Sequence, residues 1–309
     1  MKNDEIISWL LEGDISIQYQ TYRDLLDIDK PELRKRIESE GWGNEFLSYR
    51  KADGHWGQGF YQTKWISTHY TVLDLRNLNI SGDNKAIRET VNIILEAEKG
   101  EDGGINPSRS LKYSDVCISG MVLNYACYFG AYEDYLKSII DYLLFEKMND
   151  GGFNCQTSRK GAVHSSLHTT LSVVEGFIEY EKNGYKYRLD DVIEARKNAE
   201  EFILMHKLFK SDKTGEIINP NFLKLRYPGR WYYDILKAMD YFQYAKVPFD
   251  SRMDDAINII LEKRTKEGLW KLTSKYAGKI HLEMEIAGKA SRWNTLRAMR
   301  VLKYYEIEI

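Results

Sequence analysis

The chain has 309 residues, 43% of them hydrophobic and 13% aromatic, which is enough to bury a sizeable core. Its 44 Lys and Arg residues nearly balance its 46 Asp and Glu residues, so the net charge of −2 gives no electrostatic case for nucleic acid. No apolar stretch approaches the roughly 20 residues that cross a bilayer, and three cysteines are too few for a disulfide framework. We therefore expect a cytoplasmic protein with a small-molecule substrate and no membrane span.

A glycine turn returns about every fifty residues. The spacings between successive turns are 49, 48, 64 and 53 residues, at Gly54, Gly103, Gly151, Gly215 and Gly268. Each turn precedes an apolar stretch with helical spacing and then a more charged one. This period is typical of repeated helix pairs, because each pair exposes an apolar face that only its neighbours can bury. We predict an all-α fold in a single domain over 1–309, with amino-terminal helices in 1–45 and about five to six helical hairpins in 46–309.

In chain order, helical spacing predicts helices over 4–12 and 15–28, and Pro31 marks the start of a third. Inner and outer helices of the repeats then follow: 66–77 with 84–98, 115–129 with 132–147, 165–181 with 189–206, and 231–244 with 250–263, before a last inner helix over 291–306. Asp83, Asp190 and Asp250 lie where a carboxylate can cap an outer helix. The stretch 214–230 is expected to be the longest irregular region.

Glycine–aromatic turns joined to alternating inner and outer helices, over about 50–305, resemble the α/α toroid of protein prenyltransferase β subunits and of squalene and terpenoid cyclases. The resemblance implies inner helices that begin at one end of a central funnel, so that residues at their starts converge. Those starts are 67–70, 114–117, 166–169, 231–234 and 291–294. They are rich in metal ligands and acid–base groups, which is typical of a site built from repeats.

Prenyltransferase β subunits bind catalytic zinc through an Asp-x-Cys on one inner helix and a His on a later one. This chain has Asp115-Val116-Cys117, and His168 opens the next inner helix. The resemblance implies a zinc site of Asp115, Cys117 and His168 with the fourth position open. Cys155 and His164 are candidates for a further ligand. Two other interpretations stay open: Cys117 as a small buried hydrophobe, and Cys117 as a nucleophile with His164 or His168 as its base.

The activity that this resemblance implies is zinc-dependent prenyl-type transfer to or from an isoprenoid-like or other apolar, anionic substrate in an aromatic-lined cavity. A cyclase of the Asp-x-Asp-Asp type is not expected, because that tetrapeptide is absent. Aromatic rings shield apolar chains, and lysine or arginine holds an anionic group. The candidate catalytic residues are His69, His164, Tyr233 and Asp234. The candidate substrate-binding residues are His55, Trp56, Tyr61, Lys64, Trp65, Arg230, Trp231, Arg292 and Trp293.

Two alternatives remain at this point. The first is a carbohydrate-active α/α barrel, a hydrolase or lyase, whose acid would come from Asp53, Asp234 or Glu175. The second is a non-catalytic ligand-binding scaffold, in which the polar residues at the helix starts are caps.

Overall fold

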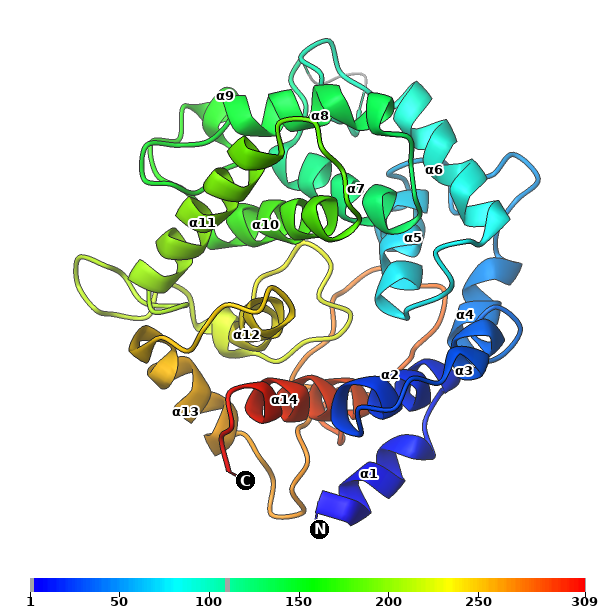
Figure 1. Ribbon diagram of the computed structural model, residues 1–309, viewed down its shortest axis with the longest axis vertical. Helices are drawn as coiled ribbons and strands as arrows, with labels where there is room; N and C mark the ends of the chain where they lie inside the picture. Colours follow the sequence, from blue (N-terminus) through cyan, green and yellow to red (C-terminus); the bar gives the residue numbers. More distant parts are fainter. Residues whose placement is uncertain (1–2, 109–111, 309) are drawn as a thin grey trace. The chain divides into compact units, whose positions relative to one another are not determined.

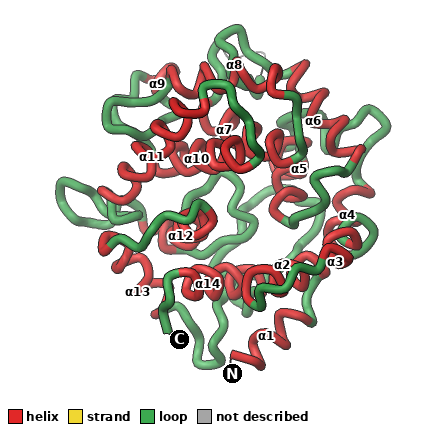
Figure 2. The backbone as a smooth tube through the Cα atoms, viewed as in Figure 1, coloured by secondary structure: helices red, strands yellow, loops and turns green. Residues whose placement is uncertain are grey.

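The protein is described by a computed structural model that covers residues 3–108 and 112–308. Within those ranges the chain is helical, and its extended backbone forms isolated bridges but no strand (Figure 1; Figure 2). The prediction of an all-α fold is therefore confirmed. The α-helices are α1 (Asn3–Leu11), α2 (Ile15–Leu25), α3 (Pro31–Arg36), α4 (Gly41–Ser48), α5 (Thr68–Asn77), α6 (Lys85–Ala97), α7 (Val116–Tyr128), α8 (Glu133–Phe145), α9 (Thr157–Lys160), α10 (Leu167–Lys182), α11 (Leu189–Met205), α12 (Ile235–Tyr244), α13 (Asp254–Glu262) and α14 (Arg292–Tyr304).

Short 3-10 helices supplement them: η1 (Lys64–Ile66), η2 (Pro220–Leu223) and η3 (Ser251–Met253). Across the described residues, none of the helices has both the length and the apolar character that crossing a membrane requires.

The predicted helix pairs are present, with small shifts at their ends. The pair expected over 115–129 and 132–147 is α7 and α8, and the pair expected over 165–181 and 189–206 is α10 and α11. The helix expected from Trp231 begins only at Ile235, because Arg230 has a left-handed φ of 51° and Asp234 is the extended N-cap residue.

Three further details of the prediction are wrong. The N-cap of α6 is Asn84 rather than Asp83, since the Asn84 side chain accepts a hydrogen bond from the Ile87 amide at 3.1 Å. Asp250 caps η3 rather than α13. In the described chain, the segment 263–291 between α13 and α14 is a longer helix-free stretch than 214–230.

The chain divides into two compact units. Unit 1 comprises Met1–Tyr49, Asn77–Ser81 and His206–Ile309, and unit 2 comprises Arg50–Arg76 and Gly82–Met205. Unit 2 carries α6 to α11, most of α5 and three of the five glycine turns, whereas unit 1 carries α1 to α4, α12 to α14 and the other two turns.

The core of unit 2 is the close packing of α7 against α10, which lie side by side in Figure 1. Glycines at the crossing allow the two backbones to approach. A Cβ atom on Gly120 would lie 2.7 Å from the carbonyl oxygen of Ser172, and one on Gly176 would lie 2.5 Å from the carbonyl oxygen of Gly120. Both distances are shorter than van der Waals contact, so any larger residue would push the helices apart. The more charged helices α8 and α11 pack on this pair.

Helix α14 organises unit 1 by packing against α12 and α2. Arg300 on α14 joins all three helices, with Nε 2.5 Å from Asp240 on α12 and Nη1 2.9 Å from Asp24 on α2. Burial by itself would raise the pKa of Asp240, but Arg300 and Arg297 hold it below its ordinary value. The paired charges therefore remain ionised inside the unit.

The glycines of the five turns all have a left-handed backbone conformation, and in four turns, at Gly54, Gly103, Gly151 and Gly268, the glycine amide donates to the carbonyl three residues earlier. Each glycine has a positive φ, between 72° and 89°, which a residue with a side chain rarely adopts. Isolated antiparallel bridges close three of the turns, Lys99 with Ile105, Lys210 with Ile217, and Arg264 with Trp270. The recurrent sequence signal is therefore a recurrent structural element.

In four of the repeats, a buried hydroxyl ties this turn to the helix that follows. The backbone N–H two residues after the glycine donates to a Ser or Thr hydroxyl in the first turn of the inner helix. The bonds run from Trp56 to Thr68 (3.0 Å), Ile105 to Ser119 (2.8 Å), Phe153 to Thr170 (3.0 Å) and Trp270 to Thr295 (3.0 Å). All eight residues have 0% of their surface exposed. We call each of these bonds a turn clamp.

The turn clamps generate a stability prediction. Thr170→Val keeps the shape of the side chain but leaves the buried Phe153 N–H without its acceptor, so we expect the free energy of unfolding to fall by about 1–3 kcal/mol. Thr170→Ser retains the hydroxyl and is the matched control. Urea denaturation of the three proteins measures the difference, and a Thr170→Val protein as stable as wild type would contradict the structural role of the clamp.

Candidate functional site

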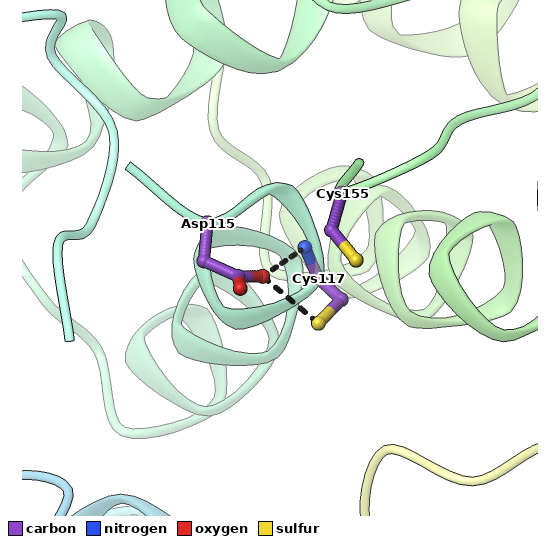
Figure 3. Close-up of side chains that lie close together, drawn as sticks. All are labelled: Asp115, Cys117 and Cys155. Carbon is purple, nitrogen blue, oxygen red and sulfur yellow. Dashed lines mark hydrogen bonds between the residues drawn. The ribbon is translucent and has the colours of Figure 1, made fainter. Parts of the chain in front are cut away.

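Unit 2 brings one carboxylate and two thiols together. Asp115 and Cys117 lie at the start of α7, and Cys155 lies in the loop before α9 (Figure 3). The ligand atoms of the three side chains all lie within 4.8 Å of one another. They come from two consecutive repeats, so the fold joins residues that are about forty positions apart in the chain.

The position of Asp115 follows from its role as the N-cap of α7. Its Oδ1 accepts hydrogen bonds from the amides of Cys117 at 3.1 Å and Ile118 at 3.2 Å. The same oxygen accepts the Cys117 thiol at 2.9 Å (Figure 3). Helix capping therefore fixes the carboxylate beside the first thiol.

The loop that carries Cys155 is fastened to the next inner helix. The Phe153–Thr170 clamp holds the turn, and the amide of Cys155 donates to Thr169 Oγ1 at 3.3 Å. Gln156 Nε2 approaches the Cys155 sulfur at 3.7 Å. Contacts with α10 thus fix the position of the Cys155 thiol, and contacts at the start of α7 fix that of the Cys117 thiol.

The two thiols have opposite proton affinities. Their interaction with each other is the largest cause: it raises the pKa of Cys117 well above its ordinary value and lowers the pKa of Cys155 to about 6. Burial and the Asp115 charge further raise the pKa of Cys117, and they oppose the lowering at Cys155, where Thr169 and Gln156 assist it. The contact between the two sulfurs therefore shifts their pKa values in opposite directions.

Lys64 in η1 is the nearby cation. Burial lowers the pKa of its ammonium group, while electrostatic interactions with Cys117 and Asp115 oppose that change. Its Nζ also lies 4.7 Å from the centre of the Trp65 ring. These interactions place a positive charge within electrostatic reach of the carboxylate–thiol group.

Aromatic side chains lie next to Lys64. Trp65 contacts Tyr70, and the Tyr61 and Tyr70 hydroxyls lie 3.2 Å apart. Burial raises the pKa of Tyr70 well above its ordinary value, with smaller contributions from Tyr61, Cys117 and Asp115. The aromatic cluster and the thiol group therefore belong to one neighbourhood of unit 2.

His69 is a buried, neutral histidine in that cluster. It has 0% of its surface exposed and contacts the rings of Phe60, Tyr61, Tyr70 and Tyr125. Its Nδ1 lies 3.4 Å from the Tyr125 hydroxyl, and burial lowers its pKa to about 3. A histidine with this pKa is uncharged at neutral pH.

The carboxylate–thiol group fits a zinc ion. Thiolate and carboxylate are preferred zinc ligands, and tetrahedral bonds of usual length put two sulfurs about 3.8 Å apart and an oxygen and a sulfur about 3.5 Å apart. The present 2.9 Å between Asp115 Oδ1 and Cys117 Sγ would open slightly on metal binding. Three anionic ligands leave a zinc centre with one negative charge, which Lys64 can balance.

The other candidate residues of unit 2 lie outside the carboxylate–thiol group. His168, the second residue of α10, is partly exposed and is not in the compact group formed by the described ligand atoms, whereas Cys155 is. His164 is exposed, and its carbonyl oxygen accepts the Asn154 side chain. His55 contacts Thr68 Oγ1 at 3.1 Å, and Trp56 is fully buried at its clamp.

Most of the unit 1 candidates make internal contacts. Asp234 caps α12, and the Tyr233 hydroxyl donates to the Leu208 carbonyl. The Arg292 guanidinium donates to the Trp9 carbonyl at 3.0 Å and lies over the Trp9 ring. The remaining candidates are buried or stacked: Arg230 is 5% exposed, Trp231 stacks on Tyr232, and Trp293 stacks on Tyr227.

The carboxylates of the carbohydrate hypothesis are not gathered in one unit. Asp53 and Glu175 belong to unit 2, where Asp53 is exposed and accepts the His55 amide, and Asp234 belongs to unit 1.

No protein-family model matches the chain, and a comparison with curated proteins finds no match.

The zinc fit predicts a measurable stoichiometry. We expect about one zinc ion per chain in the purified protein, and a loss of affinity of at least about 100-fold in Cys117→Ala and Cys155→Ala, because each removes a ligand. Cys127→Ala is the matched control, since Cys127 is fully buried in the core of unit 2. Inductively coupled plasma mass spectrometry gives the stoichiometry, and competition with a chromophoric chelator gives the affinity. Equal zinc content in all four proteins would refute the ligand set.

His69 predicts a pH dependence of stability. Its pKa is about 3 when folded, against an ordinary value of 6.5, so between these values the unfolded chain binds a proton that the folded chain does not. The free energy of unfolding should therefore decrease as the pH is lowered through this range. His69 contributes a slope of up to about 1.4 kcal/mol per pH unit. His69→Phe should have a shallower slope in urea denaturation between pH 7 and pH 5. An unchanged slope would contradict the buried neutral state.

Proposed function

We propose that unit 2 is the metal-binding part of a zinc-dependent transferase, with Asp115, Cys117 and Cys155 as protein ligands and the fourth position open to substrate. The observation that carries the proposal is the compactness of the group, whose ligand atoms lie within 4.8 Å of one another. Three protein ligands and one open position are the usual arrangement of catalytic zinc. In this proposal Cys155 takes the place that the resemblance to prenyltransferases gives to His168.

Zinc in such a site supplies a lowered pKa for a thiol or water that enters the open position. The residues around it support an apolar substrate with an anionic leaving group. Tyr61, which is partly exposed, lies in an aromatic cluster with the buried Trp65 and Tyr70 next to Lys64, whose ammonium group would attract a diphosphate. Prenyl-type transfer fits these features: the carbon–oxygen bond to the diphosphate breaks, a carbon–sulfur bond to the acceptor thiol forms, the thiol proton goes to solvent, and diphosphate leaves.

We further propose that the whole chain is a divergent α/α toroid. The support is the repetition itself: five turns with a positive-φ glycine, four turn clamps, and inner helices alternating with more charged outer ones. Repeats of this kind bury their apolar faces against each other. Zinc-binding thiols remain reduced in the cytoplasm, in agreement with the expected location of the protein.

The transferase proposal is tested with the zinc-loaded full chain. We would incubate it with prenyl diphosphates of increasing length and with small thiols or cysteine peptides, and detect thioether products by liquid chromatography and mass spectrometry. We expect product from wild type and Cys127→Ala, and a loss of at least about 100-fold in kcat/KM for Cys155→Ala. Lys64→Gln should raise KM more than it lowers kcat, because it removes a contact with the anionic group.

The controls separate zinc binding from chemistry. Wild type stripped of zinc should lose the activity and regain it on addition of the metal. Product formation that survives both zinc removal and Cys155→Ala would overturn the proposal, as would the absence of product from a protein that carries stoichiometric zinc.

A further inference from the structure

We propose that Cys155 is a modification site for hydroperoxides and that Cys117 resolves the oxidised Cys155 into a Cys117–Cys155 disulfide. The two sulfurs lie within 4.8 Å of each other, and neither takes part in a disulfide in the structure. Both residues are intermediate in exposure rather than buried. The third cysteine, Cys127, is fully buried and provides a natural contrast within unit 2.

The surroundings of the two sulfurs assign the order of events. The Cys117 thiol donates its hydrogen to Asp115 Oδ1 at 2.9 Å, so a carboxylate lies directly against this sulfur. The Cys155 sulfur instead accepts from Gln156 Nε2 at 3.7 Å, and the amide of its own residue is anchored to Thr169. The amide donor beside Cys155 stabilises negative charge on the sulfur that attacks a peroxide, whereas the carboxylate beside Cys117 repels it. Cys155 is therefore the attacking residue and Cys117 the resolving residue.

The chemistry balances with a hydroperoxide as the oxidant. The Cys155 thiolate attacks the terminal oxygen, the O–O bond breaks, and Cys155 becomes a sulfenic acid while the hydroperoxide, which takes one proton from solvent, is reduced to an alcohol, or to water. The Cys117 sulfur then attacks the Cys155 sulfur. The sulfur–oxygen bond breaks, and the hydroxyl leaves as water with the Cys117 proton. Two thiols have lost two electrons in all.

The fold permits the final approach of the sulfurs. A disulfide needs an S–S distance of about 2.05 Å, so the pair must close from its present separation. Cys117 is held in the first turn of α7, but Cys155 lies in a loop before the short helix α9. The required shift therefore falls on the loop, and α7 and α10 can keep their packing.

The thiol chemistry does not depend on zinc, but its consequence for activity rests on the proposed function. A disulfide would remove two of the three proposed ligands, so oxidation would release the metal and zinc binding would protect both thiols. The reaction would then act as a redox switch of the same site.

The experiment uses the full chain, reduced and stripped of metal, with stoichiometric hydrogen peroxide. We expect the intact mass to fall by two hydrogens, with peptide mapping locating one 117–155 cross-link and Cys127 remaining alkylatable. In Cys117→Ala the sulfenic acid cannot be resolved, so dimedone should label Cys155. In Cys155→Ala, dimedone labelling of Cys117 should be at least about tenfold slower.

Differential alkylation of wild type gives an answer even if a variant fails to fold, because it compares the three cysteines in one native protein. Loss of alkylation at Cys117 and Cys155 together, with Cys127 still alkylated, supports the proposal. Equal oxidation of all three cysteines, a cross-link that involves Cys127, or faster labelling of Cys117 than of Cys155 would overturn it. Zinc affinity of the reduced protein is measured separately, so a failure of the zinc proposal is distinguishable from a failure of this one.

Discussion

The turn clamp is the interaction on which the placement of the other residues depends. After a glycine turn alone, the chain could continue in several directions. A buried hydroxyl in the next helix accepts a hydrogen bond from the backbone N–H two residues after the glycine, and this bond fixes the direction. Four clamps of 2.8–3.0 Å do this along the chain. Because both partners are buried, losing one leaves an unsatisfied polar group, and the arrangement is strongly favoured over alternatives.

The candidate site is a consequence of two of these clamps. The Ile105–Ser119 clamp anchors the turn before α7 to that helix, whose N-cap Asp115 stands beside Cys117, and the Phe153–Thr170 clamp holds the loop that carries Cys155. Close packing of α7 on α10 through Gly120 and Gly176 then brings the two repeats together. A carboxylate and two thiols thus lie close together, although only Asp115 and Cys117 are neighbours in the sequence. Their opposite proton affinities follow from the same contacts.

The sequence was sufficient to predict the all-α fold, the repeated helix pairs and the Asp115–Cys117 half of the site, because local spacing and turn residues determine these features. It could not rank Cys155 above His168. Cys155 lies in the loop before α9, and His168 is the second residue of α10. The distance of each from Cys117 depends on the packing of α7 against α10. The start of α12 was misplaced because the left-handed Arg230 and the cap at Asp234 leave no mark in hydrophobic spacing. A sequence signal for the clamps did exist, in the Ser or Thr that recurs in the first turn of the inner helices.

X-ray absorption spectroscopy at the zinc edge tests the account most directly, because it counts sulfur ligands. For the zinc-loaded wild-type protein, the account predicts two sulfur atoms at about 2.3 Å and lighter ligands at about 2.0–2.2 Å. Cys155→Ala, loaded at higher zinc concentration, should show one sulfur, and Cys127→Ala should show two. A wild-type shell made only of oxygen and nitrogen, or a sulfur count that Cys155→Ala leaves unchanged, would contradict the proposed ligand set.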